Sequence, residues 1–107
     1  MATKNNVIIR YTTPTIKFVF NTLDVGEIED ARLVVKQQKK AVINLDFTEA
    51  TTGEGFISWL LPQEETAKLK EFENAEIYCD WKTSSGTRGR SKMTACTVEP
   101  TGYEDVM

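Results

Sequence analysis

The sequence of 107 residues contains no histidine, and this absence excludes several kinds of catalytic site at once. Histidine is the commonest general base and the commonest metal ligand in proteins. Catalytic triads that pair serine or cysteine with histidine are therefore excluded. A closed zinc site would need a cluster of thiolates, which two cysteines cannot supply. We accordingly expect a non-enzymatic protein with no catalytic residues, no metal site and no cofactor.

Cysteines and long apolar runs are also scarce. Cys79 and Cys96 lie in separate expected strands, and the sequence leaves open whether they are disulfide-bonded. The expected state is a pair of free, buried thiols in a reducing cytosol, because the first residues contain no apolar segment typical of a secretion signal. No run approaches the ~20 apolar residues of a membrane helix, so we expect no membrane insertion.

Acidic side chains are only slightly more numerous than basic ones. The 13 basic and 16 acidic side chains give a net charge of −3, whereas nucleic-acid-binding proteins usually carry a basic surplus. We therefore expect no nucleic-acid partner. The hydrophobic content of 40% is ordinary for a globular protein, and the length predicts one domain over residues 1–107 with a flexible segment at 1–6.

Most of the chain alternates between apolar and polar residues, as half-buried strands do. The alternating segments are residues 7–11, 15–20, 31–38, 41–47, 56–61, 74–82 and 90–98. Residues 21–30 and 48–55 have the composition of loops. In the last strand the apolar residues change from odd-numbered to even-numbered positions between Met93 and Cys96, which predicts a bulge. The pattern predicts an all-β fold, namely an about seven-stranded antiparallel immunoglobulin-like sandwich.

The segment LLPQEETAKLKEF, residues 60–72, interrupts the alternation and predicts one short helical turn near residues 62–70. Pro62 suits the first turn of a helix, where its missing N–H leaves no hydrogen bond unmade. The apolar residues expected to face the core from this segment are Leu61, Leu69 and Phe72.

Glu64 and Glu65 in this segment are neighbouring carboxylates, but we do not expect them to form a catalytic pair. Two carboxylates act as acid and base only where their surroundings separate their pKa values, and these lie on a polar segment. At the start of a helix their negative charges would interact favourably with the positive end of the helix dipole. Lys68 and Lys70 would interact favourably with the negative end.

Two groups of side chains are candidate partner contacts. Arg88 and Arg90 alternate with smaller residues, followed by Lys92, and would line one side of an exposed β-arm. Such residues can bind phosphate, although charged residues on an edge strand more often discourage aggregation. The second group consists of the tyrosines expected on polar faces: Tyr11, Tyr78 and Tyr103.

Two other features are expected to be structural. The acidic loop from Asp24 to Asp30 lacks the spacing of an EF-hand, so we expect a solvated loop. Trp59 and Trp81 have the parity of inward-facing residues, which favours core packing over a carbohydrate-stacking platform.

Three segments carry a resemblance to a known family. They are IRYTTPTIKFVF (9–20), ISWLLPQEETAKL (57–69) and SSGTRGRSKMTACTVEPTGYEDVM (84–107). Together they resemble the N-terminal domain of siphophage upper baseplate proteins, a family of small β-sandwich proteins encoded in tailed-phage and prophage structural operons. The QEET turn is the most specific part of the likeness, whereas Tyr11 and Pro62 depart from the family pattern.

The resemblance implies a free-standing assembly module of a phage or prophage tail or baseplate. Its implied partners are copies of itself, in a homo-oligomer, and other tail or baseplate proteins. It implies a virion component that is synthesised in the cytoplasm of the bacterial host, and it does not imply catalysis. The alternative is a small carbohydrate- or protein-binding β-sandwich module. Carbohydrate binding would need an exposed aromatic patch. The sequence leaves the strand order, the oligomer number and the identity of the partner open.

Overall fold

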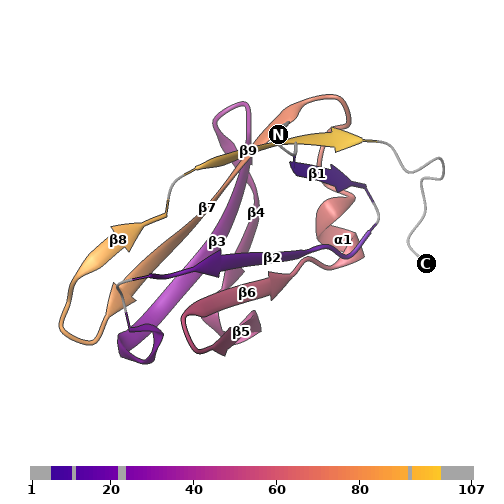
Figure 1. The fold of residues 1–107 in the computed structure, drawn as a ribbon. Helices are drawn as coiled ribbons and strands as arrows, with labels where there is room; N and C mark the ends of the chain where they lie inside the picture. Colours follow the sequence, from indigo (N-terminus) through magenta and orange to yellow (C-terminus); the bar gives the residue numbers. More distant parts are fainter. Residues whose placement is uncertain (1–5, 11, 22–23, 92, 100–107) are drawn as a thin grey trace, which may run out of the picture.

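The computed structural model describes residues 6–10, 12–21, 24–91 and 93–99, which form two β-sheets and three short helices (Figure 1). In spatial order, sheet A contains β1 (Asn6–Ile9), β9 (Thr94–Glu99), β7 (Asn74–Thr83), β3 (Ile28–Gln37) and β4 (Lys40–Asp46), with β8 (Arg88–Arg90) also paired to β7. Sheet B contains β2 (Thr15–Val19), β6 (Phe56–Leu60) and β5 (Ala50–Gly53). The helices are η1 (Val25–Glu27), η2 (Phe47–Glu49) and α1 (Gln63–Thr66).

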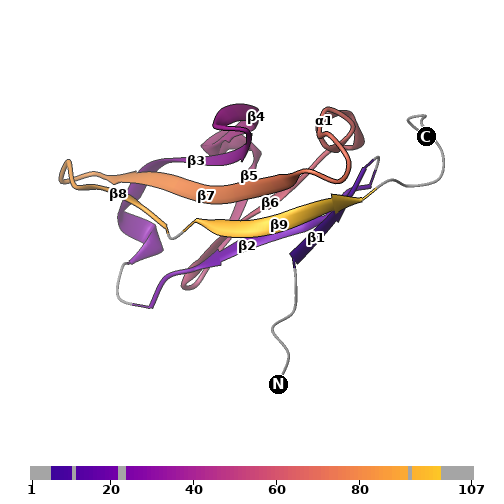
Figure 2. The same cartoon turned by 90° about the horizontal axis from the view of Figure 1, so that it is seen from above.

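The strand order is that of a variable-type immunoglobulin sandwich. Strands β9, β7, β3 and β4 take the places of strands G, F, C and C′, and β2, β6 and β5 take those of B, E and D. Figure 2 shows the two sheets as stacked layers with sheet A nearer the viewer. Among the described strands, every pair is antiparallel except that of β1 with β9. The predicted all-β, two-sheet sandwich is therefore confirmed.

The strand boundaries differ from the sequence prediction in several places. The supposed loop at 48–55 contains β5, because the backbone of its threonine-rich part pairs with β6. Strand β3 begins at Ile28 rather than at residue 31. Of the segment 1–6 that was predicted to be flexible, Asn6 belongs to β1 and is opposite Cys96 of β9, and residues 1–5 lie outside the described part.

A bulge interrupts the last predicted strand, but it lies between Arg90 and Thr94, earlier than the predicted parity change between Met93 and Cys96. Ile77 of β7 is opposite Thr94, whereas Asp80 is opposite Arg90. Two residues of β7 therefore match three residues of the returning chain, and the extra residue reverses the alternation. The interruption divides the predicted strand at 90–98 into β8 and β9.

The core lies between the sheets and follows the alternation of the sequence. The largest fully buried side chains are Trp59, Leu33, Ile43, Ile57, Leu61, Leu69, Val35 and Val98. Trp59 contacts the ring of Phe18 edge to face, with the ring centroids 5.9 Å apart. Its indole N–H donates a hydrogen bond of 2.9 Å to the carbonyl of Asp46, so this side chain buries no unpaired polar group. Trp81 is partly buried against the same core, as predicted.

The helix α1 is a single short turn, as predicted, but its charges are placed differently. It begins at Gln63 after Pro62 and ends at Thr66. Lys68 therefore lies beyond the helix, and so does Lys70. The prediction that these lysines complement a helix dipole is wrong, because so short a helix has no basic residue in its last turn. Lys68 instead pairs with Glu65 on the surface, with 2.9 Å between Nζ and Oε2.

Phe72 is exposed, which contradicts the prediction that it faces the core. Its side chain is 78% exposed, and its φ of 63° lies in the left-handed region. The N–H of Phe72 donates a hydrogen bond to the carbonyl of Val98. This tight reversal, which leads into β7, directs the ring toward solvent while Leu69 remains in the core.

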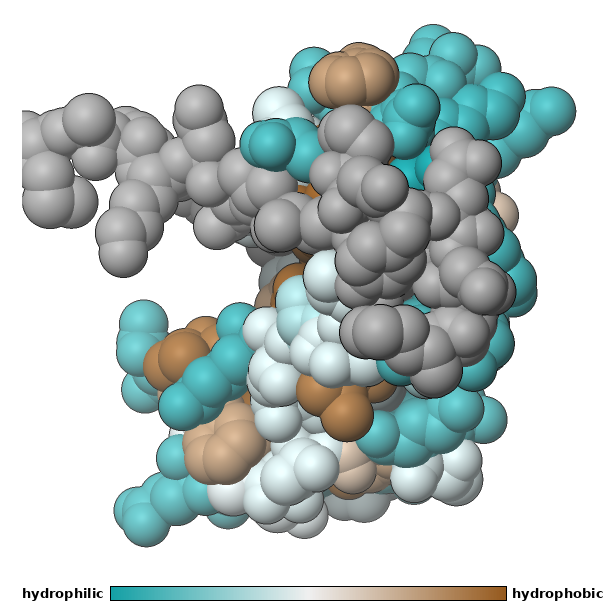
Figure 3. Space-filling view, turned by 90° about the vertical axis from the view of Figure 1, so that its right-hand side faces the viewer, coloured by the Kyte–Doolittle hydropathy of each residue, from teal (hydrophilic) through white to brown (hydrophobic). Residues whose placement is uncertain are grey.

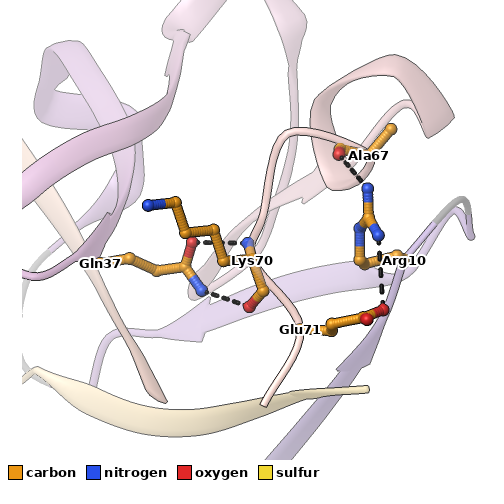
Figure 4. A network of polar contacts seen from close by, with 5 residues as sticks. All are labelled: Arg10, Gln37, Ala67, Lys70 and Glu71. Atoms are coloured by element: carbon orange, nitrogen blue, oxygen red, sulfur yellow. Dashed lines mark hydrogen bonds and ion pairs between the residues drawn. The ribbon is translucent and has the colours of Figure 1, made fainter. Parts of the chain in front are cut away.

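Two side chains distant in sequence, from the end of β3 and from the residue after β1, hold the segment that follows α1 (Figure 4). The buried amide of Gln37 donates to the carbonyl of Lys70 and accepts the N–H of the same residue, both at 2.9 Å. Arg10 donates to the carbonyl of Ala67 at 3.0 Å and forms an ion pair of 3.4 Å with Glu71. These contacts pair the carbonyl of Ala67 and both backbone groups of Lys70, which lie outside either sheet.

Leu69→Ala should lower the free energy of unfolding by about 2–5 kcal/mol, because the side chain is 1% exposed and its removal leaves a cavity. Urea unfolding followed by circular dichroism measures the change. Phe72→Ala is the matched control in the same segment and should cost little. Glu64→Gln and Glu65→Gln should also cost little, because Glu64 is exposed and Glu65 makes one ion pair near the surface, with the exposed Lys68. A large loss from either glutamine variant would mean that these carboxylates do more than flank a turn.

Candidate functional site

Strands β7 and β8 form an arm that projects at one end of sheet A (Figure 1). The loop between them is closed by Thr83, whose N–H donates to the carbonyl of Thr87 at 2.8 Å. The hydroxyl of Thr83 accepts the N–H of Thr87 at 3.2 Å, and Gly86 supplies a positive φ of 93°. These contacts define the start of β8 and therefore the position of its two arginines.

Six charged side chains lie in two cross-strand rows where β3, β7 and β8 run side by side. The rows are Asp30, Lys82 and Arg88, and then Arg32, Asp80 and Arg90. Residues opposite one another in a sheet project from the same face. Because Ala31 between them is buried, this face is the outer one. We call these six residues the charged array.

The charged array lines a shallow depression of about 420 Å³ on the outer face. Ala31, Trp81 and Gly89 line the same depression. Gly89 is required here, since a Cβ at this position would lie only 2.2 Å from a carbon of the Trp81 ring. Packing on the inner face therefore fixes the backbone that carries the array.

Arg90 is held in place by two neighbours on β7. Its Nε lies 2.6 Å from Oδ1 of Asp80, and its Nη2 lies 3.2 Å from Oδ2, which makes a two-pronged contact. The hydrogen bond to Asp80 raises the pKa of Arg90. The guanidinium also lies 4.3 Å from the centre of the Tyr78 ring.

Tyr78 is buried, which contradicts the prediction of an exposed aromatic surface at this residue. The side chain points to the outer face, but it is only 5% exposed. Arg90 lies over its ring, and the Nζ of Lys36 is 5.7 Å from the ring centre. The aliphatic stems of long cationic side chains can cover an apolar surface in this way.

The cations of the charged array are only partly neutralised. Lys82 is 3.6 Å from Glu29, and Arg90 is paired with Asp80. Within the described part of the chain, neither Arg32 nor Arg88 has an ion-pair partner. The array contains four cations and two carboxylates, and two further carboxylates lie beside it: Glu29, which pairs with Lys82, and Asp46 of β4, which is opposite Arg32.

The structure brings three of the five predicted contact residues together. Tyr78, Arg88 and Arg90 all lie on the outer face of the arm. Tyr11, Tyr103 and also Lys92 lie outside the described residues. The sequence prediction missed Arg32 and Lys82, although both occupy polar positions in the alternating pattern of their strands. The pairing of β3 with β7, which places them beside the arm, was not known from the sequence.

A second surface is the free edge of β2 in sheet B. The N–H of Phe20 donates to the carbonyl of Gly55 at 2.8 Å, so the even-numbered residues of β2 turn their backbone groups toward β6. The N–H and C=O groups of Thr15, Lys17 and Val19 therefore point away from β6. No other described strand pairs with this side.

An apolar groove of about 350 Å³ lies beside this free edge, between the two sheets. Sheet B contributes Ile16 and Phe18 to its lining, and sheet A contributes Ile8, Ile77 and Cys96. We call it the β2 groove. An edge strand with unpaired backbone groups next to an apolar groove has the features that an added strand needs.

Large apolar side chains are also exposed at scattered positions. They are Val19, Leu60, Phe72 and Met93. Figure 3 faces the end of the molecule with α1 and β1, and there the hydrophobic side chains form separate small groups among hydrophilic ones. Single exposed apolar residues are normal on a folded protein, so none of them marks a site by itself.

The two cysteines are free and buried, as predicted. Cys96 is opposite Ala75, four residues from Cys79 on β7, which separates the two cysteines by about 13 Å along the strand. A disulfide needs Cα atoms within ~7 Å. Burial raises the pKa of Cys79 to about 12 and also raises that of Cys96. Neither thiol therefore has the character of a nucleophile.

The described residues hold no group of three or more acidic or cysteine side chains that could bind a metal ion. In the acidic loop, Asp24 instead caps η1 by accepting the N–H of Gly26 at 2.9 Å. None of the helices in the described ranges has the length and apolar character to cross a membrane.

Comparisons with known proteins give a likeness to solved structures and to nothing else. No family model matches the chain, and no curated protein matches it. Among solved structures, the NK cell receptor Nkp44, described as a triggering partner in natural cytotoxicity, has a TM-score of 0.44 and 13% sequence identity. The match covers 92% of this chain and 100% of that one.

In the native protein at pH 8, both thiols should react with Ellman's reagent only when the protein unfolds. With a pKa of about 12, roughly one Cys79 side chain in 10,000 is a thiolate at that pH. Absorbance at the wavelength of the released thiolate measures the reaction, and the protein in urea provides the positive control. Rapid reaction of the native protein would contradict the burial of these cysteines.

Proposed function

We propose that the chain is a non-enzymatic structural protein of a phage or prophage virion, and that it acts as an assembly module of the tail or baseplate. Its partners are copies of itself, in a homo-oligomer, and other tail or baseplate proteins. It is made in the cytoplasm of the bacterial host. The observation that carries the proposal is the free edge of β2 beside the β2 groove.

The β2 edge supports assembly because it can accept a strand from a neighbouring subunit. The outward backbone groups of Thr15, Lys17 and Val19 would pair with the added strand. Alternate side chains of that strand would then enter the groove and contact Ile16 and Ile77. The likeness of residues 9–20, 57–69 and 84–107 to siphophage upper baseplate proteins supports the phage assignment.

A carbohydrate-binding module is the weaker candidate. Sugar recognition by stacking needs an exposed aromatic face, and the candidate tyrosine within the described ranges, Tyr78, is covered by Arg90 and Lys36. Trp59 is fully buried, and Trp81 packs against the core. The geometry therefore favours a partner that is a protein.

The phage assignment can be tested on virus particles. Particles induced from the strain that carries the gene are purified by density gradient and analysed by quantitative mass spectrometry. We expect the chain at a fixed ratio to the major tail protein. A preparation of intact tailed particles without this chain would refute the assignment.

Assembly through the β2 edge predicts a distinctive effect of Lys17→Pro. Proline removes the outward N–H of residue 17, but it spares the hydrogen bonds to β6 because those involve the even-numbered residues. Light scattering over a wide concentration range should show an oligomer for the wild type and a loss of self-association for the variant. Lys17→Ala is the control and should still associate. A wild type that stays monomeric throughout would contradict self-assembly without affecting the particle test.

A further inference from the structure

The immunoglobulin strand order leaves one place in sheet B without a described strand. In that order, the sheet that contains strands B, E and D also contains strand A, which pairs with strand B. Here β2, β6 and β5 are the equivalents of B, E and D, and among the described residues no strand lies on the other side of β2. The outward backbone groups of the β2 edge therefore face the place of strand A.

The chain enters the fold beside that place. Strand β1 pairs with β9, and its first residue, Asn6, is opposite Cys96. Both Cys96 and Ile8 of β1 line the β2 groove. The five residues that precede β1, Met1 to Asn5, therefore begin at the groove that the free edge of β2 adjoins.

The direction and the length of this segment allow it to pair with β2. Figure 1 shows β1 and β2 pointing in opposite directions, so the chain that leads into β1 runs antiparallel to β2. Five extended residues reach about 17 Å, and stacked sheets lie about 10 Å apart. After the segment has crossed between the sheets, about two residues remain to pair with the outward groups near Lys17 and Val19.

The composition of the segment suits an edge strand. In an extended chain Met1 and Thr3 project to one side, and Ala2 and Lys4 project to the other. Methionine fills irregular apolar gaps, and threonine favours strands. With Met1 turned toward the β2 groove, Lys4 stays in water, where a lysine on an edge strand discourages further pairing.

We propose that residues 1–5 act as strand A of their own chain and pair antiparallel with β2 over the β2 groove in the free protein. Because so few residues can pair, a longer strand from a neighbouring copy can displace them. The segment thereby regulates the β2 edge, since it covers the edge until an assembly partner arrives. This regulatory role rests on the proposed function, whereas the pairing itself does not.

Amide hydrogen exchange on the full chain tests the pairing. NMR follows the outward N–H groups of Lys17 and Val19 in protein that is too dilute for light scattering to detect association. We expect at least one of them to exchange at least about tenfold more slowly than in an unstructured peptide, because a hydrogen-bonded amide exchanges only when it opens. The rate should not change on further dilution, because the pairing segment belongs to the same chain.

A double variant identifies the pairing segment. Thr3→Pro together with Lys4→Pro removes two neighbouring N–H groups, one of which faces β2 whichever side the segment presents. The slow exchange should be lost in this variant and retained in the control that carries Thr3→Ala and Lys4→Ala. Because its β2 edge is uncovered, the proline variant should also self-associate at a lower concentration than the wild type.

Three results of the exchange experiment would overturn the pairing. The first is exchange of both amides at the unstructured rate in the wild type. The second is slow exchange that is lost on dilution, which would assign the pairing strand to a neighbouring copy. The third is slow exchange that persists in the proline variant, which would assign it to another segment, such as residues 100–107. A protein that never self-associates would contradict the proposed assembly and the regulatory role, but it would leave the exchange result unchanged.

Discussion

The pairing of β3 with β7 at the centre of sheet A is the constraint on which the other features depend. Both strands are ten residues long, and their register places Leu33 opposite Cys79 in the core. The same register places Arg32 opposite Asp80 on the outer face. A slip of one residue would exchange the two faces of either strand and bury charge, so the hydrophobic effect that fixes the core also fixes the charged array.

The two candidate surfaces use different physical interactions. The β2 groove offers unpaired backbone groups and apolar area, so its contacts would be little affected by salt. The charged array offers guanidinium groups on an open face, where salt screens the interaction. The groove lies between the two sheets, and the array lies on the outer face of sheet A, so the two surfaces share no lining residue.

The sequence predicted the sandwich well because alternation reports burial directly. The alternating residues of β6, Ile57 and Trp59, are fully buried as expected. Predictions failed where the deciding contact came from elsewhere in the chain. The exposure of Phe72 follows from a reversal held by Val98, and the burial of Tyr78 follows from a cation contributed by β8. Neither contact has a local signal, since both partners are separated in sequence from the residue that they control.

The sequence by itself determined the all-β class, the inward parity of the strands, the short turn at α1 and the absence of histidine chemistry. Each of these depends on residue type or on local periodicity. Only the tertiary structure decided the strand order, the free edge of β2 and the two rows of the charged array. These arise from hydrogen bonds between distant segments, whose register is selected by packing of the whole core rather than by any one stretch of chain.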